Sequence, residues 1–280
     1  MPAGSGDTGS QATRWHNVLG QRIFTAIVAL AVLGVVLFVV PAVVARVVIG
    51  AMLLAGAWEW GGFLFKQNNT GRIIYVAFVA FVIGLIYLYV HDQQRIEWLF
   101  EVAITWWFIA LVWMFFFPTP IAKTVIWFAG VFVLVPAWAA LDFLYMQSPR
   151  LLLFALLIVW VADIGAFFVG KGFGRVKLAP QISPGKTWEG VLGGLTAVTL
   201  LAAVGSHFFT TNISVLLPFC LAVTMLSVVG DLTVSMFKRN AGVKDSGSLF
   251  PGHGGVLDRI DSVTAAAPLF ALAFNWIGLK

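Results

Sequence analysis

Long apolar stretches recur along almost the whole chain, and short polar segments separate them. A helix of about 20 apolar residues is long enough to cross the hydrocarbon core of a bilayer. We therefore predict an all-α, polytopic integral membrane protein with about nine transmembrane helices. The predicted spans are 23–40, 43–64, 73–91, 100–117, 121–144, 151–170, 189–209, 213–238 and 256–277, and Pro41 alone separates the first two.

Composition supports this fold class and narrows the function. The chain has 280 residues, of which 60% are hydrophobic and 10% charged, far from the usual soluble range. Residues 1–22 are polar and lead into an apolar run too long for a signal peptide, so we expect a loose cytosolic tail. The single cysteine, Cys220, lies inside a predicted span, which excludes a disulfide framework and a cysteine metal site.

The basic residues predict the orientation in the membrane. The net charge is +5, and most of the 17 lysines and arginines fall in the N-terminal tail and in the loops after the even-numbered spans. Basic loops stay in the cytoplasm, so we place the N-terminus and these loops there, in a plasma membrane of bacterial type. These cations adjoin span ends and form no separate basic domain, which argues against a nucleic-acid partner.

The two halves of the chain differ in character. Residues 23–150 contain no catalytic constellation, and we expect them to form a scaffold with a possible role in dimerisation. Glu59 and Asp142 are ionisable groups in or near lipid, but both lie close to a span end, which favours an interfacial or packing role. Residues 151–280 hold most of the polar groups and are the predicted catalytic domain.

Four aspartates lie within or at the ends of spans in the second half: Asp163, Asp231, Asp258 and Asp261. An aspartate at the centre of a bilayer costs about 3 kcal/mol on insertion scales. Four such residues facing lipid would together cost roughly as much as a fold's whole net stability. We therefore expect them to face one another, cations or water in a shared polar cavity.

Helical spacing brings several of these groups onto common faces. Asp231, Ser235 and Lys238 follow at i, i+4 and i+7, and Asp258 and Asp261 are one turn apart at the start of the last span. Carboxylates supplemented by substrate phosphates suit Mg²⁺. The alternative is an interhelical salt-bridge network that joins Asp231 or Asp258 to Lys238 or Arg259.

Two glycine-containing loops are candidate phosphate sites. Segment 251–255, Pro-Gly-His-Gly-Gly, precedes the last span, where backbone amides and a helix N-terminus favour an anion. His253 is either an acid or base or a hydrogen-bonded loop histidine. In the other loop, Ser183 followed by Pro184 predicts a helix start, with Lys186 and Thr187 on its first turn. This loop is not a P-loop, because Pro180 replaces the required glycine and no strand is expected before it.

Three cations of that second loop, Lys171, Arg175 and Lys177, are equally compatible with a role in orientation or headgroup binding and with a role in catalysis.

The residues of these loops and helices resemble one family signature. The block Ser235-x-x-Lys238-Arg239-x-x-x-x-Lys244-Asp245-x-Gly247-x-x-x-Pro251-Gly252-His253-Gly254-Gly255-x-x-Asp258-Arg259-x-Asp261 is similar to that of the phosphatidate cytidylyltransferases (CDP-diacylglycerol synthases). The segments Ser183-Pro184-x-Lys186-Thr187-x-Glu189-Gly190 and Asp163-x-x-Ala166 also resemble this family. Phe167 departs from it, because many members have tyrosine at this position.

The resemblance implies that CTP and phosphatidic acid react to give CDP-diacylglycerol and pyrophosphate. It also implies a helical fold in contact with membrane lipids and assembly as a homodimer. The implied cofactor is Mg²⁺, with room for a second cation, and its ligands would be Asp231 and Asp258. Candidate catalytic residues are Asp231, Lys238, Arg239, Lys244, Asp258, Arg259 and Asp261, and candidate substrate-binding residues are Asp163, Ser183, Lys186, Thr187, Glu189, Ser235, Asp245, Gly252, His253, Gly254 and Gly255.

Two other functions remain open on the sequence. A CTP-dependent polyprenol kinase would use similar chemistry but would pass a phosphate to an alcohol. An ion-coupled transporter would use the intramembrane aspartates as a relay, although the internal repeat expected of many transporters is not evident.

Overall fold

The computed structural model describes residues 28, 30–90, 92–247 and 254–279 and divides the chain into two units, Met1–Val48 and Ile49–Lys280. In the first unit, a helix over 30–38 ends before Pro41, and the next helix begins at Ala42. The expected break at Pro41 is therefore confirmed. Much of the predicted span 23–40 and of the tail 1–22 lies outside the described residues.

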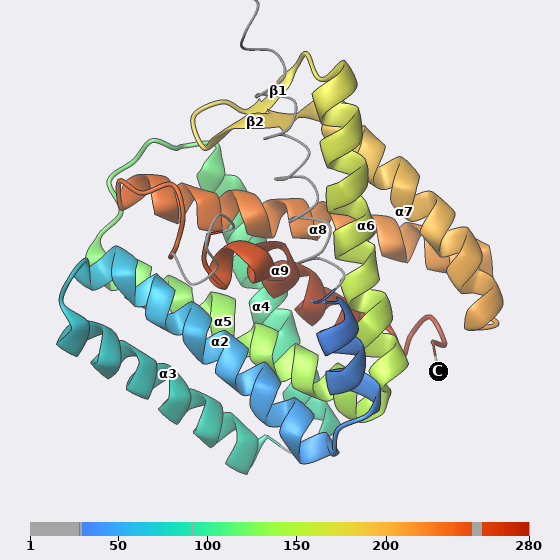
Figure 1. Cartoon of the computed structure of the whole chain (residues 1–280), viewed down its shortest axis with the longest axis horizontal. Coiled ribbons are helices and arrows are strands. Elements are labelled where there is room, and N and C mark those ends of the chain that lie inside the picture. Colours follow the sequence, from blue (N-terminus) through green and yellow to red (C-terminus); the bar gives the residue numbers. More distant parts are fainter. Residues whose placement is uncertain (1–27, 29, 91, 248–253, 280) are drawn as a thin grey trace, which may run out of the picture. The chain divides into compact units, whose positions relative to one another are not determined.

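The remaining elements follow one another mostly as long helices (Figure 1). They are α2 (Ala42–Phe65), α3 (Asn69–Tyr89), α4 (Gln93–Met114), α5 (Lys123–Gln147), α6 (Pro149–Phe173), β1 (Lys177–Ala179), β2 (Ser183–Thr187), α7 (Trp188–Phe208), α8 (Ile213–Asn240) and α9 (Leu257–Ala273). Seven of them, α2 to α8, are long and apolar enough to cross a membrane. The prediction of an all-α, polytopic membrane protein is confirmed.

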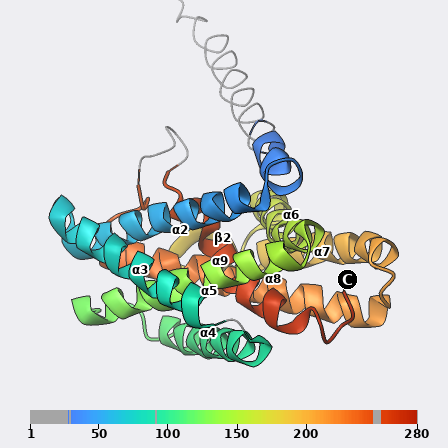
Figure 2. The same ribbon diagram turned by 90° about the horizontal axis from the view of Figure 1, so that it is seen from below.

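The count of nine spans is not confirmed in the described part of the chain, because only α2 to α8 are both long and apolar enough there to cross a membrane. It has 17 residues, which makes it roughly 26 Å long, slightly shorter than a typical hydrocarbon core. Nearly all of its residues are buried, and it packs against α8, α5 and α4 (Figures 1 and 2). The helix is thus a core element of the second unit.

Polar caps explain several helix boundaries. Asn68, Asp92, Ser148 and Asn212 each accept a hydrogen bond from the first turn of the helix that follows. The cap at Asp92 starts α4 at Gln93, several residues before the apolar run that defined the predicted span 100–117. Apolar length alone therefore located the helices but not their polar first turns.

The segment before α7 differs from its prediction. Ser183–Thr187 forms strand β2, which pairs antiparallel with β1, and Thr187 lies opposite Lys177. The helix begins at Trp188, and the Thr187 hydroxyl accepts a hydrogen bond from the Gly190 amide at 3.1 Å. The predicted helix start at Ser183 is wrong because Thr187 provides the cap. Pro184 is tolerated because a two-stranded sheet has only edge strands.

Small residues allow α6 and α7 to approach closely, and the two helices run side by side in both views (Figures 1 and 2). A Cβ atom on Gly194 would lie 2.8 Å from the carbonyl oxygen of Ala162. One on Gly165 would lie 2.7 Å from the carbonyl oxygen of Gly193. Membrane helices commonly pack through such small residues. The close approach, together with the hairpin at the ends of these helices, frames the cavity described next.

Candidate active site

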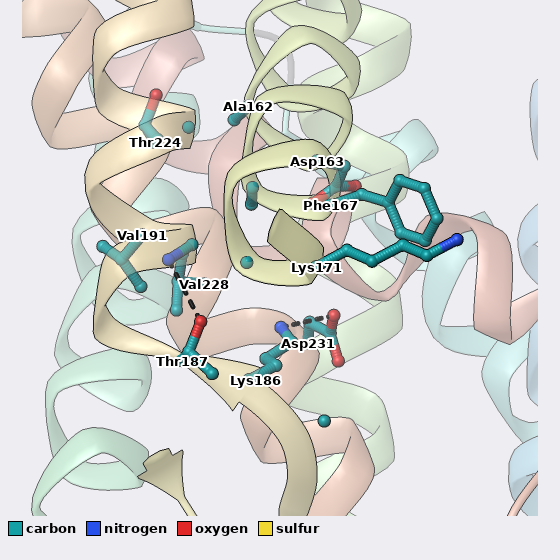
Figure 3. Close-up of a pocket in the computed structure, with 15 residues that line it drawn as sticks. Ala162, Asp163, Phe167, Lys171, Lys186, Thr187, Val191, Thr224, Val228 and Asp231 are labelled. Atoms are coloured by element: carbon teal, nitrogen blue, oxygen red, sulfur yellow. Dashed lines mark hydrogen bonds and ion pairs between the residues drawn. The ribbon is translucent and has the colours of Figure 1, made fainter. Parts of the chain in front are cut away.

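A cavity of about 500 Å³ opens between α6, β2, α7 and α8 (Figure 3), and we call it the polar cavity because charged side chains stand among its apolar lining residues. Carboxylates come from α6 and α8, lysines from α6 and β2, and glycines from α6, β2 and α7. The lining residues are Ala162, Asp163, Ala166, Phe167, Gly170, Lys171, Gly185, Lys186, Thr187, Gly190, Val191, Gly194, Thr224, Val228 and Asp231. The predicted shared polar cavity therefore exists for two of the four aspartates.

Lys186 and Asp231 form the charged centre of this cavity. The Lys186 ammonium lies 2.5 Å from one carboxylate oxygen of Asp231, across the gap between β2 and α8. The Ser235 hydroxyl, one turn further along α8, donates to the other oxygen at 3.2 Å. The predicted common helix face of Asp231 and Ser235 is confirmed. Asp163 lines the same cavity from α6 and is exposed along it.

A second charged centre joins the end of α8 to the start of α9. The Lys238 ammonium lies 2.8 Å from Asp258 and 3.8 Å from Asp261, and only about a tenth of each side chain is exposed. Asp261 also accepts a hydrogen bond from the Ser262 amide at 2.9 Å. Lys238 thus interacts with α9, and the interhelical salt bridge considered as the alternative for Asp258 is present.

Asp258 is held by more than Lys238. It accepts hydrogen bonds from the amides of Ser246 at 3.0 Å and Gly255 at 2.9 Å. It lies on the first turn of α9, outside the seven candidate spans. Burial opposes ionisation, but Lys238 and these amides outweigh it and hold the pKa of the Asp258 carboxyl below its usual value. The side chain is therefore a stable anion, the form that pairs with cations.

The donor chemistry of these residues is compatible with Mg²⁺. Among the described residues, no group of three histidine, cysteine, aspartate or glutamate side chains lies close enough to hold a metal ion. Mg²⁺, however, commonly uses one or two carboxylates together with substrate phosphates and water. Asp231 and Asp258 each already bind a cation, the ammonium group of a lysine. A Mg²⁺ ion held by these two carboxylates stays a prediction.

Three predicted substrate-binding or catalytic residues instead hold the β1–β2 hairpin in place. The hydroxyl of Thr187 caps α7, and the Glu189 carboxylate accepts from the Val176 amide at 3.1 Å. Arg239 donates from its Nε to the carbonyl oxygen of Ile182 at 3.1 Å and so connects α8 to the hairpin. Contact of these three residues with substrate stays a prediction. Ser183 begins β2 and pairs with Ala179.

The remaining candidates lie on the segment that joins α8 to α9 and on the first turn of α9. Lys244 and Asp245 on the segment and Arg259 on α9 are exposed, so their side chains are accessible to a soluble ligand. Gly254 has a φ of +79°, which favours glycine. Gly252 and His253 lie outside the described residues, so their predicted roles stay predictions.

One residue has a larger role than its position suggested. Glu59 on α2 is 5% exposed and accepts hydrogen bonds from Ser246, Val256 and Leu257, on both sides of that segment. Glu59 does have a packing role, as expected. No spacing rule, however, connects it with residues almost 200 positions later in the chain. The only available signal was an ionisable group in an apolar helix.

An apolar groove of about 420 Å³ lies next to the polar cavity. Val191 on α7 and Val228 on α8 line both spaces and so form a common wall. The other lining residues come from α4 and the segment after it, the hairpin, Trp188 and α8: Leu111, Met114, Phe115, Phe117, Leu178, Ala179, Pro180, Gln181, Ile182, Trp188, Met225, Val229 and Leu232. A charged cavity and an apolar groove therefore share one wall in a membrane protein.

Comparisons with known proteins identify the family. A sequence model described as "Cytidylyltransferase family" matches residues 20–277. The chain is 41% identical over 271 residues to a phosphatidate cytidylyltransferase of Pseudomonas aeruginosa, covering 92% of this chain and 97% of that protein. It is 37% identical over 291 residues to one of Haemophilus influenzae, covering 93% and 100%. The chain therefore belongs to the cytidylyltransferase family.

Proposed function

We propose that the protein transfers the cytidylyl group of CTP to phosphatidic acid and releases pyrophosphate, which gives CDP-diacylglycerol. The observation that carries this proposal is the common wall between the polar cavity and the apolar groove. A phospholipid has a charged head and apolar chains, and it needs both environments side by side. The relatives named phosphatidate cytidylyltransferase support the same substrate pair.

The phosphate of phosphatidic acid enters the cavity that Lys186 and Asp231 line, and an acyl chain follows the groove past Val191 and Val228. The groove offers an acyl chain that leaves the bilayer an apolar environment like the one it had among the lipid tails. Since Trp188 and Met225 line the groove and are exposed to the surroundings, the chain can enter sideways from the bilayer.

The reaction is an in-line displacement at the α-phosphorus of CTP. An oxygen of the lipid phosphate forms the new bond, the bond between the α-phosphorus and the bridging oxygen breaks, and pyrophosphate leaves with that electron pair. A phosphate monoester has a second pKa of about 6 and is an anion at neutral pH, so the attack needs no general base. The described site accordingly contributes cations and hydrogen bonds.

The side chains then have two tasks. Lys186 and Lys238 neutralise phosphate oxygens, and the exposed Lys244 and Arg259 bind the leaving pyrophosphate as it reaches the aqueous side. Ser235 and Asp163 orient the groups around Asp231. Holding two anions in line in one cavity reduces the entropic part of the barrier, which proximity can lower by several kcal/mol.

Asp231 and Asp258 are the residues that would hold Mg²⁺, with Asp261 beside them. When bound, the ion would neutralise phosphate charge and polarise the phosphoryl oxygens. Based on the distribution of basic residues, we place the site on the cytoplasmic side, where CTP is available. A homodimer, as the family resemblance implies, is also part of this proposal.

Radiolabelled CTP tests the reaction. Purified protein in detergent micelles with phosphatidic acid and Mg²⁺ should move label from [α-³²P]CTP into lipid, whereas label from [γ-³²P]CTP should appear in pyrophosphate. Lipid labelled from the γ-phosphate would instead establish a lipid kinase. Asp231→Asn and Asp258→Asn, checked for folding by gel filtration, should both lose turnover. Normal turnover in both would refute the assigned site.

A further inference from the structure

The carboxylate of Glu59 provides the N-terminal cap that α9 lacks in its own sequence. The N-cap residue of α9, Val256, has no side chain able to accept a hydrogen bond, and Asp258 is the only acidic residue of the first turn. One Glu59 oxygen accepts from the Val256 amide at 2.9 Å, and the other accepts from the Leu257 amide at 2.8 Å. A negative group at this position also interacts favourably with the helix dipole.

The same carboxylate also binds the other end of the loop. The Ser246 hydroxyl donates to Glu59 at 2.7 Å, while the Ser246 amide donates to Asp258 at 3.0 Å. Ser246 is therefore held by two carboxylates from different helices. Glu59 consequently fixes the residue that in turn helps to fix Asp258.

Two glycines make this approach possible. A Cβ atom on Gly247 or on Gly255 would collide with the Glu59 carboxylate. Gly255 also donates its amide to Asp258 at 2.9 Å. The backbone on both sides of the loop thus lies against Glu59 at a distance that only glycine permits.

We propose that Glu59 is a positioning residue for the reaction: it acts through Ser246 and the first turn of α9 to hold Asp258 in place beside Lys238. This inference rests on the proposed function for its kinetic part. Its geometric part stands independently, because the hydrogen bonds that Glu59 accepts can be tested without turnover.

Glu59→Gln isolates the effect because it keeps the size of the side chain but replaces one oxygen with an NH₂ group. The donors at Val256 and Leu257 use different oxygens, so one amide must then face another donor. Glu101→Gln, which changes an exposed carboxylate on α4, is the matched control.

The first measurement is independent of activity. Trypsin should cleave after the exposed Lys244 about tenfold faster in Glu59→Gln than in the wild type, because the loop opens locally more often. Glu101→Gln should be cleaved at the wild-type rate. Equal cleavage rates for all three proteins would overturn the proposed clamp, whatever the protein catalyses.

The second measurement tests the positioning of Asp258. Per folded protein, kcat of Glu59→Gln should fall about 10- to 100-fold, while KM for CTP stays within about threefold. Ser246→Ala should add little to this loss in the double variant, because the two residues act through one contact. If kcat stays at the wild-type value although cleavage accelerates, the positioning role is wrong. An inactive wild type would instead count against the proposed function.

Discussion

Replacement of Lys238 by methionine tests whether the buried charge pair stabilises the fold. Methionine is similar in length and apolar, so the change removes the ammonium with little loss of volume. Lys238 lies 2.8 Å from Asp258 and 3.8 Å from Asp261, in surroundings where about nine tenths of each side chain is inaccessible. Without the ammonium, Asp258 and Asp261 keep their backbone hydrogen bonds but lose the cation that lies between them.

Removing one partner of a buried pair costs about 3–5 kcal/mol, because the remaining charge keeps its desolvation penalty. For a chain of this size each kcal/mol corresponds to roughly 2–4 °C in Tm, so we expect a decrease of roughly 6–20 °C. Thermal unfolding of purified protein in micelles, followed by tryptophan fluorescence, measures it. Lys123→Met, at an exposed lysine on α5, should change Tm by less than about 2 °C.

The double variant Lys238→Met with Asp258→Asn gives the sharper comparison. If the loss arises from the unpaired Asp258 charge, removing that charge should restore at least about half of the stability. An additive result, in which the double variant is less stable than Lys238→Met by the full cost of Asp258→Asn, would refute the pairing. A Tm of Lys238→Met equal to that of the wild type would refute it as well.

Three further outcomes are expected. Met225→Trp should fill the apolar groove and raise KM for long-chain phosphatidic acid about fivefold or more. It should leave KM for dihexanoyl phosphatidic acid and for CTP unchanged. The control variant Leu200→Trp, at an exposed position on α7, should change none of these KM values. Gly193→Ala should lower Tm because its Cβ would collide with α6, whereas Gly84→Ala has open space and should leave Tm unchanged or raise it by roughly 1–4 °C, because alanine in place of glycine stabilises a helix by roughly 0.5–1 kcal/mol. Millimolar Mg²⁺ should raise Tm of the wild type and not of Asp231→Asn, and an equal rise in both would exclude Asp231 as a ligand.

Hydropathy predicted most of the fold because long apolar runs impose helices in lipid. Hydropathy alone does not decide whether α9 crosses the membrane, since a helix buried among other helices can be as apolar as one that faces lipid. The β1–β2 hairpin was also missed. Its strands are too short to show a period of two, and Ser183-Pro184 resembles a helix start. Only tertiary pairing of Lys177 with Thr187 distinguishes the two structures.

The site was predictable to the extent that its contacts lie within one helix. Asp231 and Ser235 are one turn apart, and their hydrogen bond follows from helix geometry. The partner of Lys238 cannot be derived in this way, because spacing gives only the face of α8 on which Lys238 lies. Its pairing with Asp258 depends on how α8 crosses α9. The same reason conceals Glu59, whose partners are fixed by the packing of α2 against the start of α9.

The observed pairs also constrain how a polyanionic substrate can bind. Lys186 and Lys238, the two lysines closest to the aspartates, already neutralise Asp231 and Asp258. A phosphate that takes either ammonium therefore leaves a carboxylate unpaired, and for a buried carboxylate this costs several kcal/mol. Asp231 and Asp258 would avoid this penalty if they held a divalent cation that arrived with the nucleotide, because Lys186 and Lys238 would then be free to bind the phosphate. Hence CTP and Mg²⁺ together should raise Tm by more than the sum of their separate effects, and strict additivity would contradict this exchange of partners.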